Sequence, residues 1–148
     1  MLPATVLLTL IATTVLKDSD AYLSESAIKK TQQMLKNVCS KKHSIEEDVF
    51  NFIKNGKFPD NNNDIKCYFS CIFKTMQMVN QKGMLDKKMF KDKMTMMAPP
   101  NVLKILLPAI EQCIGNGNDK GSEICQSSYD FIKCAYTLDP TTLEYLPL

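Results

Sequence analysis

The chain has 148 residues, with 45% hydrophobic and 23% charged residues, which is the composition of one ordinary globular domain and excludes a disordered chain. Its 18 basic residues are all lysines, set against 16 acids, and they form no concentrated basic block, so nucleic acid is not expected as a partner. His43 is the only histidine, which argues against multi-histidine zinc sites and the usual serine triad. We therefore expect no enzyme, no metal and no cofactor.

Residues 1–16 form a short apolar stretch at the start of the chain. This length suits the apolar region of a signal peptide, whereas about 20 residues are needed to cross a membrane. Ser19 and Ala21 present the small side chains that a signal peptidase reads, so we place the cleavage after Ala21. The sequence thus predicts a signal peptide at 1–21, a mature domain at 22–148, secretion, and no stable membrane insertion.

The rest of the chain shows helical periodicity and no sustained alternation typical of strands, so an all-α domain is predicted. Three helix starts are marked by caps, namely the capping box of Ser44 and Glu47, Asp86, and Ser122. Glycines and prolines mark several of the ends. The predicted helices span residues 24–39, 44–56, 64–82, 86–98, 101–114 and 122–137.

Apolar stripes within these helices predict the faces that point inward. The third predicted helix has a wide stripe, and the fifth is apolar on nearly all sides, so it should be buried on several faces. Pro108 lies inside the fifth helix and predicts a kink or a later start of that helix. The stripe of the third helix consists of Ile65, Tyr68, Phe69, Ile72, Phe73, Met76 and Val79.

Six cysteines in a secreted chain of this size predict three disulfides, and the even number permits complete pairing. Cys125 and Cys134 would lie on opposite sides of one helix and about 13 Å apart along its axis, so they cannot bond to each other. Cys67 and Cys71 share one face of a helix, where a bond would connect nothing distant. Excluding these two bonds still leaves several connectivities open.

This pattern resembles the insect odorant-binding and pheromone-binding protein family over essentially the whole of residues 22–148. The resemblance rests on the signal peptide, the all-helical chain, the three residues between Cys67 and Cys71, and the eight residues between Cys125 and Cys134. It implies about six helices around an internal apolar cavity. The implied disulfides are interlocked and join Cys39 to Cys71, Cys67 to Cys125 and Cys113 to Cys134.

The resemblance also implies a secreted carrier, which binds small hydrophobic odorants or pheromones reversibly and transports them through aqueous fluid to receptors. The expected ligand is a volatile alcohol, aldehyde, ester or terpenoid. An odorant receptor and a second copy of the chain, in a weak homodimer, are the other expected partners. Methionines in the wall would adapt it to several ligands, and two tyrosines would offer hydroxyl groups to a ligand oxygen. The implied lining is Phe73, Met76, Met89, Phe90, Met94, Leu103, Leu106, Leu107, Ile110, Tyr129, Phe131, Ala135 and Tyr136.

The tail at residues 141–148 is too apolar to lie free in water, so we expect it to pack onto the domain. In some members of the family a tail at this position closes the cavity and is released as the pH falls. The resemblance therefore implies a lid role, and ligand contacts, for Tyr145 and Leu146. No tail residue is a histidine, so a pH response would have to use carboxyl groups such as those of Asp139 and Glu144.

Other classes of protein remain open on the sequence alone. A secreted phospholipase would need a His–Asp pair and a glycine-rich calcium loop, whereas Ser44 follows His43 here. A helical signalling protein would act through its surface. A carrier of hormones, lipids or amines outside olfaction is a further alternative, and an amine carrier needs an interior carboxylate. Asp130 is the only acid near the inward face of the sixth predicted helix, and we expect it to lie outside.

Overall fold

The computed structural model describes residues 22–115 and 123–148, so the predicted signal peptide and the predicted cap at Ser122 lie outside the described residues. These two ranges fold into α-helices and one short 3-10 helix, which confirms the predicted all-α fold. No described helix is long and apolar enough to cross a membrane. The elements are α1 (Glu25–His43), α2 (Glu47–Lys54), α3 (Asn63–Thr75), α4 (Lys87–Met97), α5 (Pro100–Cys113), α6 (Ile124–Leu138) and the 3-10 helix η1 (Pro140–Tyr145).

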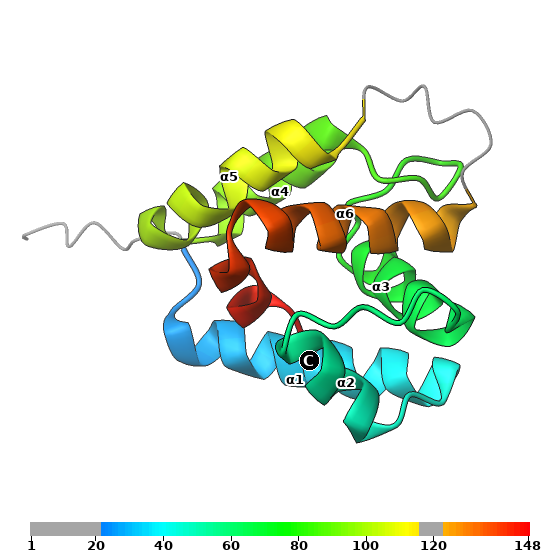
Figure 1. Ribbon diagram of the computed structural model, residues 1–148. Helices are drawn as coiled ribbons and strands as arrows, with labels where there is room; N and C mark the ends of the chain where they lie inside the picture. Colours follow the sequence, from blue (N-terminus) through cyan, green and yellow to red (C-terminus); the bar gives the residue numbers. More distant parts are fainter. Residues whose placement is uncertain (1–21, 116–122) are drawn as a thin grey trace, which may run out of the picture.

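Two helices, α3 and α6, form the centre of the fold and pack against each other (Figure 1). On one side α1 packs against α3, and on the other side α5 packs against α6 and α4. After α6 the chain turns back, so that η1, drawn in red, lies between the α5 side and α1 (Figure 1). The tail is therefore enclosed by the helices, as expected from its apolar residues.

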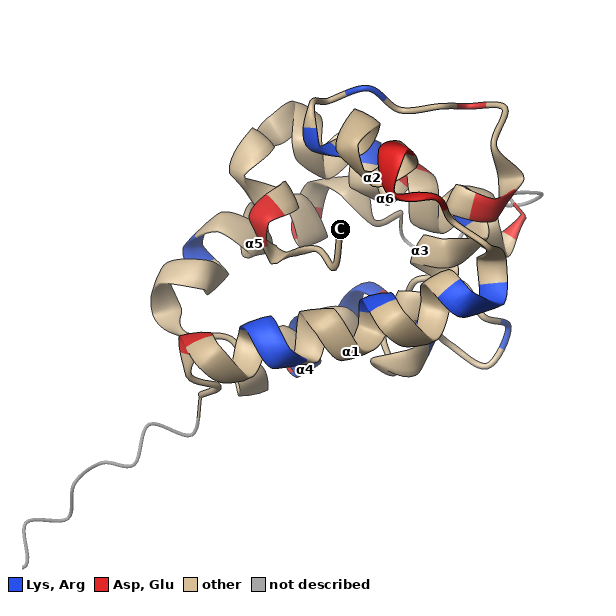
Figure 2. Cartoon of the chain, turned by 90° about the horizontal axis from the view of Figure 1, so that it is seen from below, with Lys and Arg blue, Asp and Glu red and all other residues tan. Residues whose placement is uncertain are grey.

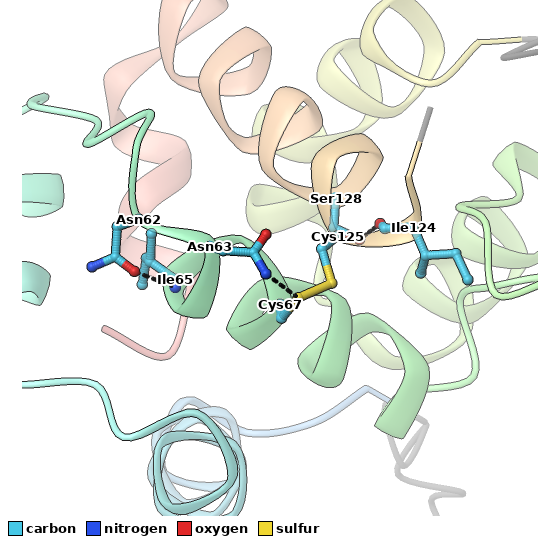
Figure 3. Close-up of a disulfide and its surroundings, with 7 residues drawn as sticks. All are labelled: Asn62, Asn63, Ile65, Cys67, Ile124, Cys125 and Ser128. Atoms are coloured by element: carbon cyan, nitrogen blue, oxygen red, sulfur yellow. Dashed lines mark hydrogen bonds between the residues drawn. A yellow bond between two sulfur atoms is a disulfide. The ribbon is translucent and has the colours of Figure 1, made fainter. Parts of the chain in front are cut away.

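Side-chain caps begin three of the helices. Ser24 Oγ accepts a hydrogen bond from the backbone N–H of Ala27 at 3.2 Å and begins α1. Asn62 Oδ1 accepts from the N–H of Ile65 at 3.1 Å and begins α3 (Figure 3). Asp86 Oδ1 accepts from the N–H group of Met89 at 2.8 Å, which confirms the predicted cap of α4.

The predicted capping box of Ser44 and Glu47 is wrong. Ser44 instead ends α1, where it adopts a left-handed backbone conformation with φ 49°. The next helix, α2, begins at Glu47 without any side-chain cap. The Glu47 side chain does not accept a hydrogen bond from the backbone at the start of α2. It forms an ion pair with Lys36 of α1 instead, with an Oε2 to Nζ distance of 2.8 Å. An ion pair between two helices has replaced the local cap.

The third helix is shorter than predicted, because α3 ends at Thr75 and its predicted stripe residue Val79 lies beyond it. Gln77 has a φ of 58°, which turns the chain out of the helix. The turn places Met78 in the core and pairs Val79 with Leu85 in a single antiparallel bridge. Packing of Met78 thus overrides the helical period of the sequence.

In α5 the two prolines behave differently. Pro100 is the first residue of the helix, where a missing N–H group costs nothing, whereas Pro108 lies inside it. The helix begins at Pro100, so the later start that Pro108 suggested is wrong. The last helix, α6, begins at Ile124 with Glu123 at the N-cap position and without a side-chain cap.

All three implied disulfides are confirmed, with Cα to Cα distances of 5.8 Å for Cys39–Cys71, 4.4 Å for Cys67–Cys125 and 5.7 Å for Cys113–Cys134. They join α3 to α1, α3 to α6 and α5 to α6. Figure 3 shows the second bond, with Asn63 Nδ2 3.9 Å from Cys67 Sγ. In the chain-entropy model each bond contributes about 3 to 4 kcal/mol, an upper bound because the loops interlock.

Candidate ligand-binding cavity

The interior of the fold contains an apolar cavity with a volume of about 110 Å³. Its wall combines residues from every α-helix except α2, together with the loop before α1, the turn after α3, and the tail. The lining residues are Leu23, Ile28, Thr31, Gln32, Leu35, Ile72, Phe73, Met76, Met78, Phe90, Met94, Met97, Ala98, Val102, Leu106, Ala109, Ile110, Phe131, Ile132, Ala135, Thr142, Tyr145, Leu146 and Pro147.

Three aromatic rings from three helices meet at the wall. Phe73 of α3, Phe90 of α4 and Phe131 of α6 have ring centroids 5.4, 5.6 and 5.2 Å apart, in tilted and edge-to-face arrangements. Such pairs stabilise the packing by about 0.5 to 1.5 kcal/mol each beyond the burial of their area. This cluster fixes where α4 lies against the centre of the fold.

Within the described residues, no charged side chain lines the cavity. The charged residues instead occupy the outer helix faces and the connecting segments, and Figure 2 shows lysines along α1. The ion pairs of the described residues are also on the surface, for example Lys91 with Glu111 at 2.5 Å. The cavity therefore offers an uncharged ligand a low-polarity interior.

The tail forms one wall of the cavity and is fixed by two side chains. Tyr68 of α3, which is fully buried, donates its hydroxyl hydrogen to the carbonyl oxygen of Pro147. Gln32 of α1 donates from Nε2 to the carbonyl oxygens of Glu144 at 2.9 Å and Leu146 at 3.4 Å. The prediction that the tail packs onto the domain is confirmed.

A more polar hollow on the surface adjoins the cavity beside the tail. It is bordered by Glu25 and Lys29, which form an ion pair at 2.9 Å, and by Pro100 and Glu144. The residues that line both the cavity and this hollow are Leu23, Ile28, Gln32, Val102 and Tyr145. The start of α1, the α4–α5 turn and the tail thus meet where the interior comes nearest to this hollow.

Most of the residues implied by the family layout come together at the cavity. These residues, drawn from α3 to α6 and the tail, are Phe73, Met76, Phe90, Met94, Leu106, Ile110, Phe131, Ala135, Tyr145 and Leu146.

Three other predicted lining residues lie elsewhere. Met89 is 40% exposed on the outer side of α4, because it is one residue away from the inward face marked by Phe90. Leu103 and Leu107 are half-buried and pack against the core, but neither reaches the cavity.

Tyr129 and Tyr136 also lie outside the cavity wall. Tyr129 is fully buried on the other face of α6, where its ring packs edge to face with Phe58 at 6.1 Å. Tyr136 packs against Phe58 at 5.4 Å and against Gly56, so closely that a Cβ added at Gly56 would lie 2.6 Å from the Tyr136 Cζ. Neither hydroxyl group serves the cavity as predicted.

Sequence reasoning missed the contribution of α1, and in α5 it found Leu106 and Ile110 but took Leu103 and Leu107 in place of Val102 and Ala109. Ile28 and Leu35 are seven residues apart on one face of α1, a helical spacing that is visible in the sequence. In α5 the lining residues are Val102, Leu106, Ala109 and Ile110. Because α5 is apolar on most sides, its period does not select between faces. Nothing local indicated Met78, which reaches the wall through the turn at Gln77.

The residues on which the rival classes depend are far from this interior. His43 ends α1 and does not line the cavity. Asp130 is exposed, as expected, and accepts a hydrogen bond from Gln126 Nε2 at 2.7 Å. The described residues hold no group of three or more histidine, cysteine or acidic side chains that could bind a metal ion.

The disulfide-linked helices around an apolar interior define a class of small helical proteins with room for an apolar ligand. The family model of the PBP/GOBP family matches residues 21–137, so the chain belongs to this family of pheromone-binding and general odorant-binding proteins. The chain is 25% identical over 118 residues to general odorant-binding protein 72 of Anopheles gambiae, which covers 80% of this chain and 95% of that protein. Membership of the family supports a role as a carrier of small hydrophobic ligands.

Solved structures show the same fold. Odorant binding protein 5 of Apis mellifera has a TM-score of 0.69 at 24% identity, covering 80% of this chain and 94% of that chain. Odorant binding protein 4 of Chrysopa pallens has a TM-score of 0.70 at 24% identity, covering 81% of this chain and 96% of that chain.

Proposed function

We propose that this protein is a secreted carrier that binds small hydrophobic odorants or pheromones in the described cavity and transports them through aqueous fluid to receptors. The observation that supports this proposal is a cavity whose described lining is almost entirely apolar and includes no charged side chain. An empty apolar cavity costs the protein packing contacts, which an apolar ligand restores. Residues 1–21 would act as the signal peptide that directs secretion.

The size of the cavity limits the ligand. An apolar protein cavity of about 150 Å³ takes up benzene, so the present volume of about 110 Å³ suits a small ring or a short chain. Longer ligands require the wall to move, and the flexible side chains of Met76, Met78, Met94 and Met97 permit this. At roughly 0.6 kcal/mol per heavy atom, a ligand of about eight heavy atoms binds with a dissociation constant of about 0.3 mM.

The methionines make the proposal testable by NMR with carbon-13 methyl labels. On titration of the protein with 2-heptanone, the methyl signals of the four cavity methionines are expected to shift with one common dissociation constant. Met89 and Met96, which are 40% and 62% exposed on α4, provide the matched controls and should not shift. If the cavity signals stay still up to the solubility limit of several ketones and alcohols, the carrier function is wrong.

We also propose that the tail acts as a lid, with Tyr145 and Leu146 as its ligand-facing residues. Both line the cavity, and Tyr145 also borders the surface hollow, so displacement of the tail would open the interior at that place. Deleting residues 141–148 is expected to speed ligand exchange by about tenfold or more and to weaken binding, because part of the wall is lost. Line-shape analysis of the same methyl signals measures both quantities. Unchanged exchange and affinity would exclude the lid.

Secretion is tested separately from binding. Expression of the full chain in insect cells should release a protein whose amino-terminal residue is Tyr22, as read by mass spectrometry of the culture medium. Retention inside the cell, or release with residues 1–21 still attached, would contradict the proposed signal peptide.

A further inference from the structure

The few polar side chains in the cavity wall have already used their hydrogen-bond donors. Thr31 Oγ1 donates its single hydrogen to the carbonyl oxygen of Ala27 at 2.9 Å, inside α1. Thr142 Oγ1 donates to the carbonyl oxygen of Asp139 at 2.7 Å, at the start of η1. A hydroxyl group has one hydrogen and two lone pairs, so each threonine can now only accept a hydrogen bond.

Gln32 is restricted in the same way. Its two partners, the carbonyl oxygens of Glu144 and Leu146, can only accept, so the amide nitrogen must face them and both of its hydrogens are directed to the tail. The amide oxygen, Oε1, remains as the polar atom of this side chain that can bind something else. It too is an acceptor.

The backbone of the wall offers no free donor where it leaves the regular helices. The N–H groups of the lining residues outside the helix interiors all donate within the protein, at 2.8 to 3.0 Å for Leu23, Met76, Met78 and Ala98. Leu146 donates to Leu143 at 3.1 Å, and Pro147 has no N–H group. The first-turn N–H groups of Ile28 and Val102 are also paired, at 2.9 and 3.0 Å.

Among the described lining side chains, the hydroxyl group of Tyr145 is the one remaining donor. Tyr145 lies at the boundary with the surface hollow and is partly exposed, so water can accept the hydrogen bond of this hydroxyl group. Apart from this hydroxyl group, the polar side-chain atoms of the described wall are acceptors without a free donor hydrogen.

We propose that the cavity selects ligands by their hydrogen-bond donor, so that an alcohol or phenol binds more tightly than the ketone, aldehyde or ether of the same carbon skeleton. This inference rests on the proposed carrier function. An alcohol can donate to Thr31, Thr142 or Gln32, whereas a carbonyl oxygen loses its hydrogen bonds to water and gains none from these three side chains. Among the ligand classes expected for the family, the wall thus favours alcohols over aldehydes and esters.

The test compares matched pairs of ligands by the methionine-methyl titration. The pairs are 2-heptanol with 2-heptanone and 1-phenylethanol with acetophenone. Ketones are used because aldehydes react with lysine amines. In both pairs the alcohol is expected to bind about fivefold to tenfold more tightly, the effect of one hydrogen bond gained or one polar group left unpaired.

The result separates the two proposals. If no ligand shifts the cavity methionines, the carrier function fails. If both members of each pair bind with similar affinity, or the ketone binds more tightly, the carrier function stands and the donor selection is wrong.

Variants identify the acceptors. Thr31→Val and Thr142→Val keep the shape and remove the hydroxyl oxygen, and Gln32→Met removes the amide oxygen. At least one of the three should lower the alcohol-to-ketone ratio to below about twofold. Thr137→Val is the matched control, since Thr137 makes the same local bond to Lys133 at 2.9 Å on the exposed side of α6. If none of the three variants lowers the ratio, or the control lowers it equally, the assignment is overturned.

Tyr145→Phe tests the remaining donor. Without this hydroxyl group the alcohol preference should persist or increase, because a ketone then has no side-chain donor at all. A preference that disappears in Tyr145→Phe would show that the alcohol is held by Tyr145 and not by Thr31, Thr142 or Gln32, which contradicts the proposal.

Discussion

Tyr68 and Tyr129 are both fully buried, but their hydroxyl groups have different surroundings. Tyr68 donates to the carbonyl oxygen of Pro147, whereas the Tyr129 hydroxyl has no hydrogen-bond partner among the described residues. Burial raises the pKa of both phenols above their ordinary value, because ionisation would place a charge away from water. Both hydroxyl groups therefore stay neutral, and the one on Tyr68 fixes the tail.

Removing each hydroxyl group should have opposite effects on stability. Tyr68→Phe leaves a buried carbonyl without its donor and should lower the free energy of unfolding by about 1 to 2 kcal/mol. Tyr129→Phe removes a buried group that has no partner and should leave this free energy unchanged or raise it by up to about 1 kcal/mol. Urea unfolding followed by circular dichroism measures both. If Tyr129→Phe lowered the free energy of unfolding as much as Tyr68→Phe does, this result would contradict an unpaired Tyr129 hydroxyl group.

At the scale of single residues, the sequence could predict the cavity only in part. Phe90 and Met94 were found because their spacing marks one face of an amphipathic helix. Tyr129 was assigned to the cavity for its chemistry, but its position on α6 points it toward Phe58 on the opposite face. The side of a helix that faces a cavity depends on its neighbours, and these are known only from the fold.

Pro100 and Pro108 occupy the same helix and are both exposed, but they differ in position. At the first position Pro100 fits the helical backbone and gives up no hydrogen bond. Inside the helix Pro108 removes the N–H group that would bind the carbonyl of Lys104. The cost of a proline is therefore concentrated at residue 108.

Replacing the two prolines should separate these effects. Pro108→Ala is expected to raise the free energy of unfolding by about 1 to 2 kcal/mol, the gain in helix propensity reduced by the greater freedom of the unfolded chain. Pro100→Ala, the matched control, should change it by less than about 0.5 kcal/mol or lower it. Thermal unfolding of both variants is the measurement. An equal change in both would show that position in α5 does not matter.

At the scale of elements, helix identity was predictable and helix ends were not. Asp86 and the Pro99–Pro100 pair gave the correct bounds of α4 because their effects are local, whereas Gly83 lies well beyond the end of α3. Ser44 and Gln77 end their helices in the left-handed region without being glycines, with φ values of 49° and 58°. Tertiary contacts produce these turns, including the ion pair of Glu47 and the burial of Met78, so a local pattern does not reveal them.

At the scale of the whole molecule, the ion pairs contribute to how stability responds to acid. Hydrogen bonds from lysine partners lower the pKa of Glu25, Glu47, Asp60 and Glu111 below their ordinary values of 4.5 for Glu and 3.8 for Asp. A carboxyl group whose pKa falls on folding stabilises the fold above its unfolded pKa, and this stabilisation is lost as the pH falls through the folded pKa.

The melting temperature should therefore be nearly constant from about pH 8 to pH 5 and should fall below about pH 4.5. Because these pairs are exposed, 1 M salt should reduce the dependence on pH. Differential scanning calorimetry across this range is the measurement. A melting temperature that falls between pH 7 and pH 5 would contradict the assignment of the acid response to these carboxyl groups.

The disulfides should differ in their effect on stability, because they close loops of different length. Residues 67 and 125 are separated by 58 positions, and residues 113 and 134 by 21. Replacing both cysteines of the longer loop by serine should cost about 4 kcal/mol, and the same change in the shorter loop about 3.4 kcal/mol. Guanidinium unfolding of the two double variants checks the order. The reverse order would show that chain entropy does not dominate.

The disulfides hold some helices of the cavity wall but not others. Helices α1, α3, α5 and α6 are joined covalently, whereas α4 contains no cysteine and rests on its ring cluster and on α5. Four of the helices around the interior are thus held by covalent bonds, whereas α4 is held by noncovalent contacts. A ligand larger than the unliganded cavity is therefore expected to displace α4 or the tail, which are held by noncovalent contacts, before it displaces the four disulfide-linked helices.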